Sequence, residues 1–158
     1  MLRLSGLVCA MLLGSSAAQA DWQYTRWGMT EQEVVAASEG QARKPKRPDT
    51  YEGGSPLHLL EAPYKTGDFA FVAKFNFDRF RRLETVKLQL RNIHSCPALQ
   101  GTLSNIYGPP KVSTTSLGRF AKWWDSDNGN VLILSDYPGM WCYVQYSVYK
   151  RPGEKGGL

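Results

Sequence analysis

The fold is decided by Ser95-Cys96-Pro97-Ala98-Leu99-Gln100-Gly101-Thr102-Leu103-Ser104-Asn105-Ile106-Tyr107-Gly108-Pro109-Pro110, the clearest helix signal in the chain. Its apolar residues recur at spacings of three and four, which places them on one face of a helix. These residues are Cys96, Leu99, Leu103 and Ile106. Pro97 is tolerated in the first turn, and Gly108 followed by two prolines ends the helix. We therefore expect a helix with one apolar face between two strand-rich blocks.

Strand signals lie on both sides of this helix. Residues 68–77 and 83–91 alternate between apolar and polar side chains, as strands with one buried face do. A shorter strand is expected over 57–61, with a turn over 63–67. After the helix we expect strands over 119–124, 131–135 and 140–149. Asn128-Gly129 predicts a hairpin between the first two of these.

A shorter helix is expected near the start of the chain, over 31–39. Thr30 and Glu33 form the capping-box pattern, and Gly40 is a natural residue just past a helix end. Residues 21–27 are either a short strand or an arm that packs Trp22 and Trp27 onto the core.

The order of elements is therefore helix, three strands, helix and three strands. This order predicts an α+β fold, with an antiparallel sheet of about six strands and two helices on one face, built from duplicated helix-plus-three-strand units. The chain of 158 residues, with 42% hydrophobic and 21% charged content, suits a single domain. We place that domain at 21–150 and a flexible basic tail at 151–158.

Residues 1–20 have the pattern of a cleaved signal peptide. Arg3 supplies a positive charge, residues 4–13 form a short apolar run, and Ala18-Gln19-Ala20 is a small-x-small cleavage site. The apolar run is too short to span a bilayer, and no later stretch has the length and apolarity of a transmembrane segment. We therefore expect a periplasmic or secreted protein whose mature chain begins at Asp21.

Cleavage removes Cys9 and leaves Cys96 and Cys142. Two cysteines in an oxidising compartment predict one disulfide. The alternative is a reactive thiol, which needs an activating base nearby. His94 is close in sequence to Cys96, but at a spacing that does not share a helix face.

Two short stretches resemble known envelope proteins. Gly28-Met29-Thr30-Glu31-Gln32-Glu33-Val34 is similar to the Gly-Met-Thr-x-x-x-Val helix start of small envelope proteins of the SmpA/OmlA type. Ile106-Tyr107-Gly108-Pro109-Pro110 resembles the helix exit of the same families. The related β-lactamase-inhibitor-protein fold also doubles a helix-plus-antiparallel-sheet unit. The chain lacks the lipid-bearing cysteine of the SmpA/OmlA group, and the resemblance implies an exported, non-enzymatic protein-binding module.

Few residues suit catalysis or metal binding. His58 and His94 are far apart in sequence, and no nucleophile elbow or phosphate-binding motif is present. Asp125-x-Asp127 fits a hairpin turn better than a calcium loop, which would need Gly where Asn130 stands. We predict no enzyme, no metal and no cofactor.

The formal net charge of +5 is a modest basic excess. The basic residues of the 43–47 stretch lack interleaved aromatic residues, and we interpret them as a solvated connection rather than a binding patch. We therefore expect no nucleic-acid partner.

The candidate binding residues are aromatic. If Cys142 faces the helix, then Trp141, Tyr143 and Tyr149 face away from it. One of two neighbouring tryptophans must join them, because consecutive strand residues alternate. The candidate set is Trp123, Trp124, Trp141, Tyr143, Tyr149 and Lys122.

An open aromatic sheet face would be a binding surface, whereas a face covered by residues 21–27 or by the long loop would be core. We expect an exported, non-catalytic binding module that recognises a protein or peptide partner in the cell envelope through this face. The alternative is a periplasmic domain that binds a small ligand or a glycan with the same rings.

Overall fold

The protein is described from a computed structural model that covers residues 21–46 and 57–149. The predicted signal peptide (1–20) and basic tail (151–158) lie outside the described residues, as does part of the long loop.

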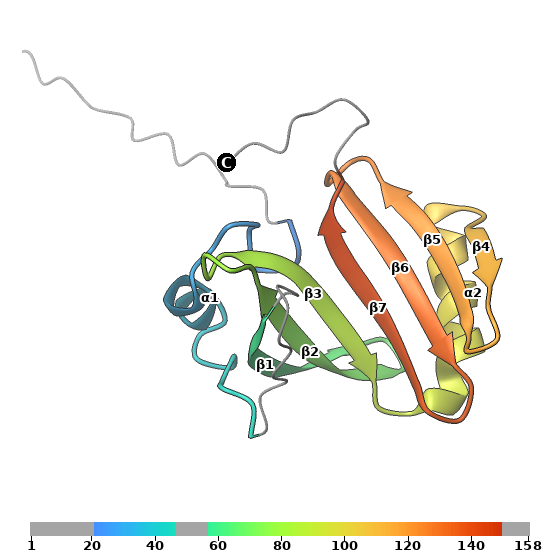
Figure 1. The fold of residues 1–158 in the computed structure, drawn as a ribbon, viewed down its shortest axis with the longest axis horizontal. Coiled ribbons are helices and arrows are strands. Elements are labelled where there is room, and N and C mark those ends of the chain that lie inside the picture. The colour runs from blue at the N-terminus through green and yellow to red at the C-terminus, as the bar shows by residue number, and fades with distance from the viewer. Residues whose placement is uncertain (1–20, 47–56, 150–158) are drawn as a thin grey trace, which may run out of the picture.

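Within those ranges the chain folds into a seven-stranded antiparallel sheet with two α-helices (Figure 1). The order across the sheet is β1-β2-β3-β7-β6-β5-β4, so two consecutive meanders meet where β3 pairs with β7. The strands are β1 (Leu57–Thr66), β2 (Phe69–Phe77), β3 (Leu83–Leu90), β4 (Lys111–Thr114), β5 (Arg119–Asp125), β6 (Asn130–Tyr137) and β7 (Trp141–Val148). The helices are α1 (Glu31–Ala37), the 3-10 turn η1 (Ile93–Ser95) and α2 (Cys96–Tyr107). The α+β prediction is therefore confirmed in its main outline.

Two strands differ from the sequence-based prediction. β1 continues through Pro63, where a turn was expected, because this strand lies at the edge of the sheet and proline is tolerated there. β4 was not predicted, because all four of its residues are exposed and it shows no alternation of apolar and polar residues. The second helix is consequently followed by four strands rather than three.

One hydrophobic core lies between the helices and one face of the sheet. The helices contribute Val34, Leu99 and Leu103, and the sheet contributes inward side chains from both meanders. The largest of these are Phe71, Phe75, Phe77, Trp123, Leu132 and Leu134. Figure 1 shows α1 beside the first meander and α2 behind the second.

The segment that leads into α1 is an arm that packs on the core. Trp22 is buried with its ring 5.3 Å from that of Tyr64 and 5.8 Å from that of Phe75. Thr30 and Glu33 form the predicted capping box, which satisfies backbone N–H groups at the start of α1. Aromatic burial and helix capping together hold this end of the chain on the helix-bearing face.

The predicted disulfide is present between Cys96 and Cys142. Both residues are buried, and their Cα atoms are 6.0 Å apart. The bond joins the first residue of α2 to β7 and closes a loop with a sequence separation of 46 residues. It therefore fixes α2 to one face of the sheet and defines the opposite face, which we call the outer face.

Candidate binding surface

Strand alternation places the candidate residues on the two faces of the sheet. In β7, Cys142 and Val144 are buried toward α2, so Trp141 and Tyr143 project from the outer face. Cross-strand pairing extends this assignment, because Tyr143 lies opposite Ser135 and Ser135 lies opposite Phe120. The outer face of the second meander is therefore known residue by residue.

Four side chains form an aromatic cluster at one end of the outer face: Phe120, Tyr137, Trp141 and Tyr143. Tyr137 is at its centre, with its ring 5.7 Å from Phe120, 6.0 Å from Trp141 and 6.3 Å from Tyr143. The first two contacts are edge-to-face and the third is stacked, which are favourable arrangements for aromatic pairs. The rings thus support one another and form a continuous apolar surface.

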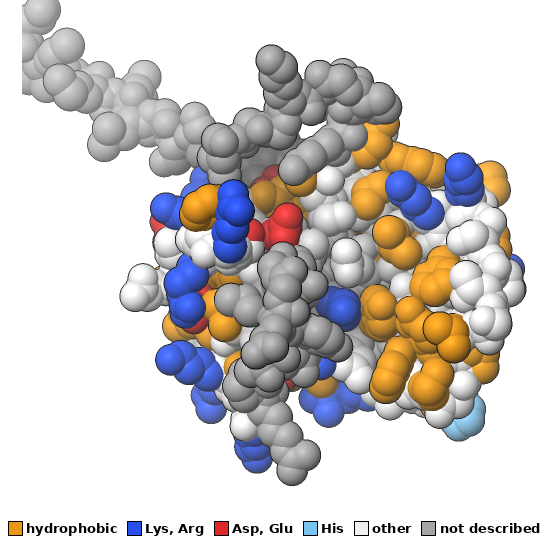
Figure 2. Space-filling view, viewed as in Figure 1, with side chains coloured by type: hydrophobic (Ala, Val, Ile, Leu, Met, Phe, Trp, Pro, Cys, Tyr) orange, Lys and Arg blue, Asp and Glu red, His pale blue; other side chains and the backbone are white. Residues whose placement is uncertain are grey.

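The aromatic cluster is open to solvent. Trp141 is 47% exposed, and two aliphatic side chains on the adjoining turns, Leu117 and Met140, are more exposed still. Figure 2 shows hydrophobic side chains gathered over the second meander on this face. The arm of residues 21–27 does not cover them, because Trp22 packs on the opposite side of the sheet against Phe75.

A shallow hollow of about 420 Å³ adjoins the aromatic cluster at the end of the sheet. Its lining includes Leu117, Gly118 and Met140. Gly118 is required there, because a Cβ at this position would lie 2.4 Å from the carbonyl oxygen of Asp136. The close approach of these two backbones brings the turn that contains Leu117 beside the rings.

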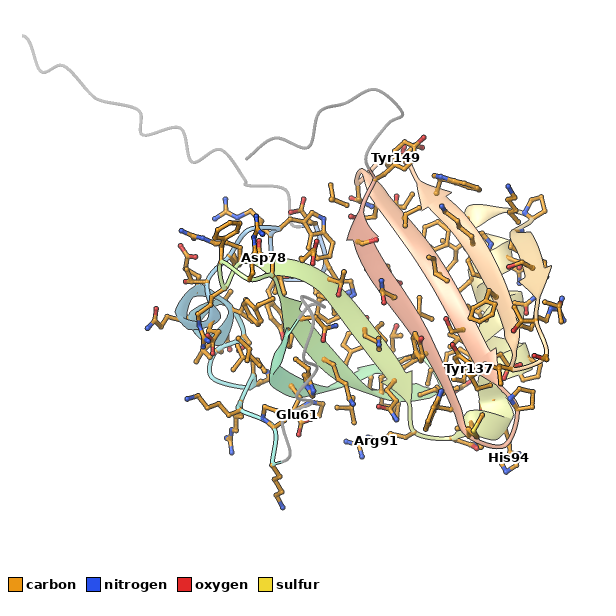
Figure 3. All side chains as sticks on the ribbon, viewed as in Figure 1. Glu61, Asp78, Arg91, His94, Tyr137 and Tyr149 are labelled. Carbon is orange, nitrogen blue, oxygen red and sulfur yellow. A yellow bond between two sulfur atoms is a disulfide. The ribbon has the colours of Figure 1, made fainter. Side chains whose placement is uncertain are left out.

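The other candidate residues form a second group at the far end of the outer face. Trp124 is 44% exposed, and the Lys122 ammonium lies 5.1 Å from the centre of its ring. Trp124 lies in the same cross-strand row as Ser147 of β7. Ser147 is six residues along β7 from Trp141, so the two groups are about 20 Å apart. Figure 3 shows Tyr137 and Tyr149 at opposite ends of these strands. The predicted set is therefore two groups rather than one site.

Trp123 does not belong to the outer face. It is 1% exposed on the helix-bearing face, where its indole N–H donates to the Gly108 carbonyl at 2.9 Å. Its role is to pack β5 against the end of α2. Because adjacent strand residues alternate, only one of Trp123 and Trp124 can face outward, and the structure assigns Trp124 to that face.

Two members of the aromatic cluster were missed from the sequence. Phe120 shares its face with Lys122 and Trp124, so its alternation with them was the available signal. Tyr137 lies beyond the strand expected over 131–135, whereas β6 continues through Tyr137. Desolvation within the cluster, with a further contribution from Tyr143, raises the pKa of Tyr137, so the Tyr137 phenol is neutral at physiological pH.

Basic side chains stand among the outer-face rings. The Lys87 ammonium lies 4.5 Å from the centre of the Tyr143 ring, and Lys122 lies over Trp124. Both are cation–π contacts, which hold the ammonium groups close to the sheet while they stay charged. The surface offers aromatic contact area and positive charge together.

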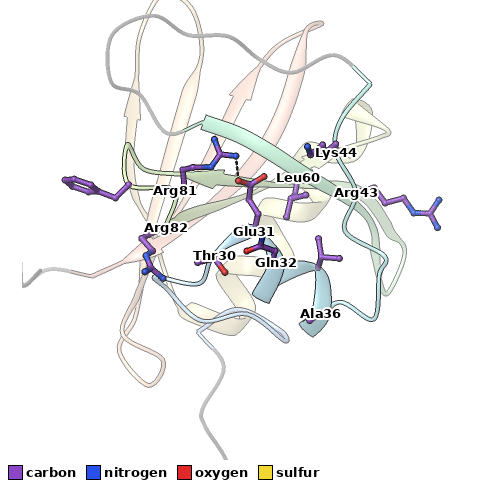
Figure 4. A pocket seen from close by; sticks show the side chains of 11 residues that line it. Thr30, Glu31, Gln32, Ala36, Arg43, Lys44, Leu60, Arg81 and Arg82 are labelled. Atoms are coloured by element: carbon purple, nitrogen blue, oxygen red, sulfur yellow. Dashed lines mark hydrogen bonds and ion pairs between the residues drawn. The ribbon is translucent and has the colours of Figure 1, made fainter.

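A larger hollow of about 690 Å³ lies beside α1 (Figure 4). Leu60 and Glu31 point toward its centre, whereas Arg43 and Arg82 point outward. Glu31 forms an ion pair with Arg81 across the hollow. Aliphatic and charged residues line most of it, and the candidate aromatic residues do not take part.

The described part of the chain contains no group of three or more His, Cys, Asp or Glu residues that could hold a metal ion. Asp125 accepts hydrogen bonds from Asn128, as expected of a hairpin turn. His58 is buried, with its Nε2 atom 3.8 Å from a carboxylate oxygen of Glu61. None of the described helices has the length and apolarity needed to cross a membrane.

Comparison of the sequence with protein-family models and with curated proteins gives no match. Among solved structures, the chain is similar to the crystal structure of a DUF4309 family protein (YjgB) from Bacillus subtilis. The two share 15% sequence identity, and the alignment covers 80% of this chain and 83% of the other with a TM-score of 0.48. At that level the likeness assigns no function.

Proposed function

We propose that this protein is a non-catalytic binding module that recognises a protein or peptide partner through the outer face of its sheet. The observation that carries the proposal is the exposed, mutually packed aromatic cluster around Tyr137 and Trp141. Exposed apolar patches rimmed by polar residues mark interaction sites, and Trp, Tyr and Arg dominate the binding energy of protein interfaces.

The shape of the surface favours a macromolecule over an enclosed ligand. The rings of Tyr137, Trp141 and Tyr143 project from a sheet, and the hollow beside them is shallow and lies at their edge. Drug-sized ligands bury most of their surface in clefts, whereas protein partners use flatter surfaces with aromatic anchors.

The alternative proposal is a small-ligand or glycan site that uses the same rings. The stacked pair of Tyr137 and Tyr143 supports it, because flat rings can stack on a sugar. This alternative predicts saturable binding of free oligosaccharides that Trp141→Ala removes, without any protein partner.

An envelope location remains part of the proposal. A disulfide with both cysteines buried suits an oxidising compartment, such as the periplasm or the exterior of the cell. The resemblance to SmpA/OmlA-type and β-lactamase-inhibitor-protein-like modules also stays a prediction, and it forms part of the same proposal.

The test is a pull-down from envelope extract with the chain from Asp21 onward. Trp141→Ala should lose the captured protein, because it removes the exposed anchor of the aromatic cluster. Phe80→Ala is the matched control, since Phe80 is an exposed aromatic residue beside the α1 hollow. Equal recovery by the wild type and Trp141→Ala would refute the proposed site.

A further inference from the structure

Residues that pair directly across neighbouring strands form a single row over the outer face, from one edge of the sheet to the other. It contains Lys111, Lys122, Ile133, Gln145, Lys87, Lys74 and Glu61, one residue from each of β4, β5, β6, β7, β3, β2 and β1. We call this row the lysine row. Four of its seven positions are lysine, and its acidic residue, Glu61, lies at the β1 edge opposite Lys74.

The lysine row places like charges opposite each other twice. Lys111 pairs with Lys122 on neighbouring strands, and Lys74 pairs with Lys87. Like charges at directly opposite positions destabilise a sheet. The cross-strand neighbours of Lys122 and Lys87 on their other sides are Ile133 and Gln145, which are uncharged. Neither Lys122 nor Lys87 therefore has an acidic residue directly opposite it on a neighbouring strand.

Aromatic residues border the lysine row on both sides. Phe120 and Tyr143 lie on one side and Trp124 on the other, each displaced by two residues along its strand. Cation–π contacts tie Lys87 to Tyr143 and Lys122 to Trp124. Figure 2 shows basic side chains beside the hydrophobic ones on this face.

We propose that the lysine row binds an extended acidic segment of the partner, whose apolar side chains pack on the flanking rings. This inference rests on the proposed function, and it names the chemistry of the partner. Lys111 and Lys74 are five strand spacings apart, or about 24 Å, which about seven residues of an extended chain would cover. Negative charge would relieve the repulsion between Lys111 and Lys122 and would be attracted to Lys87, and apolar side chains would cover the rings.

A peptide suits this surface better than an anionic glycan or a nucleic acid. Ile133 lies beside the central position of the lysine row, and Phe120, Tyr143 and Trp124 border the row, so much of the contact area is apolar. A peptide supplies carboxylates and apolar side chains together, whereas sugars and phosphates supply little aliphatic surface. Binding of an anionic glycan or of a nucleic acid instead is an outcome that the test distinguishes.

The experiment measures fluorescence anisotropy of labelled heptapeptides titrated with the chain from Asp21 onward. The first peptide repeats Glu-Glu-Phe-Phe, which puts both kinds of side chain on each face of an extended chain. Matched peptides replace Glu by Gln or by Lys. Unlabelled oligogalacturonate and oligothymidylate serve as competing anionic glycan and nucleic-acid probes.

The acidic peptide should bind about tenfold more tightly than the Gln peptide. Its affinity should fall as the salt concentration rises from about 0.05 to about 0.5 M. Lys87→Gln/Lys122→Gln should bind it about tenfold more weakly, at about threefold for each half-buried lysine charge. Arg26→Gln/Arg79→Gln removes the same charge from exposed positions outside the lysine row and should bind as the wild type does. Unfolding midpoints in urea distinguish a binding defect from a folding defect, because the lysine variant should be at least as stable as the wild type.

Equal binding of the Glu and Gln peptides, or no effect of the lysine substitutions, would overturn the acidic-segment proposal. If Trp141→Ala still weakens binding in that case, the proposed aromatic site stands on its own. Failure of all three peptides to bind would overturn the acidic-segment proposal. Tighter binding of oligogalacturonate or of oligothymidylate than of any peptide would also overturn it, and would identify the partner as an anionic glycan or as a nucleic acid, respectively.

Discussion

Reduction of the Cys96–Cys142 disulfide should destabilise the domain by about 4 kcal/mol. The bond closes a loop with a sequence separation of 46 residues, and the chain-entropy model assigns about that free energy to a loop of this length. A typical domain has a free energy of unfolding of about 5–15 kcal/mol, so the loss is a large fraction of the total. The reduced protein should therefore be marginally folded.

Urea denaturation with and without reductant measures this loss. With a slope of about 1.5 kcal/mol per molar urea, a loss of about 4 kcal/mol moves the unfolding midpoint down by about 2–3 M. The matched control is Cys96→Ala/Cys142→Ala, whose midpoint should be low and should not respond to reductant. A midpoint that stays within about 0.3 M on reduction would refute the reasoning, as would two free thiols in the unreduced, denatured protein.

Three further predictions concern single residues. Trp123→Ala should cost about 3–5 kcal/mol of stability in urea denaturation, because a buried ring and its bond to the Gly108 carbonyl are lost, whereas Trp124→Ala should change stability by no more than about 0.5 kcal/mol. Burial raises the pKa of Tyr146 above that of the unfolded chain, so stability should be fully present below about pH 10 and should fall as pH rises above it; a spectrophotometric tyrosine titration should show one group that ionises only on unfolding. Gly118→Ala should cost about 1–3 kcal/mol, because the added Cβ meets a backbone oxygen, and thermal unfolding measures it.

A different experimental result would contradict each of these three predictions. Greater destabilisation by Trp124→Ala than by Trp123→Ala would mean that β5 has the opposite register. Tyr146→Phe should reduce the alkaline loss of stability, and an unchanged alkaline profile would exclude Tyr146 as its source. A Gly118→Ala protein as stable as the wild type would show that the backbones of the 117–118 turn and Asp136 are farther apart.

The architecture could be predicted because one-sided alternation is a local signal. The alternation in 68–77 and 83–91 identified β2 and β3. The capping box at Thr30 was equally local. Each of these features depends on neighbours a few positions away. The disulfide could be predicted for a different reason, because the expected mature chain has one possible pair of cysteines, Cys96 and Cys142.

The helix face was predicted with one error. Ile106 is 65% exposed, although its spacing from Leu103 fits a helical stripe. Leu99, Leu103 and Tyr107 are each four residues apart, and it is Tyr107 that packs against the core. At 3.6 residues per turn, positions 106 and 107 lie about 100° apart, so the sheet's position decides which of them is inward.

Features that depend on long-range pairing could not be predicted. The choice between Trp123 and Trp124 follows from the pairing of β5 with β6. The lysine row exists only because β3 pairs with β7 in one register, which brings Lys87 into line with Lys122. No local pattern encodes that pairing, because residues far apart in sequence meet there.

The most direct test of the central claim is in-cell photo-cross-linking from the outer face. Trp141 is replaced by the photoreactive amino acid p-benzoylphenylalanine, and the adduct is identified by mass spectrometry. Replacement of Ile106 is the control, because Ile106 is exposed on α2, away from the outer face. The account predicts an adduct from position 141, and none from position 106, with an acidic segment of another polypeptide. No adduct from position 141, or the same adducts from both positions, would contradict it.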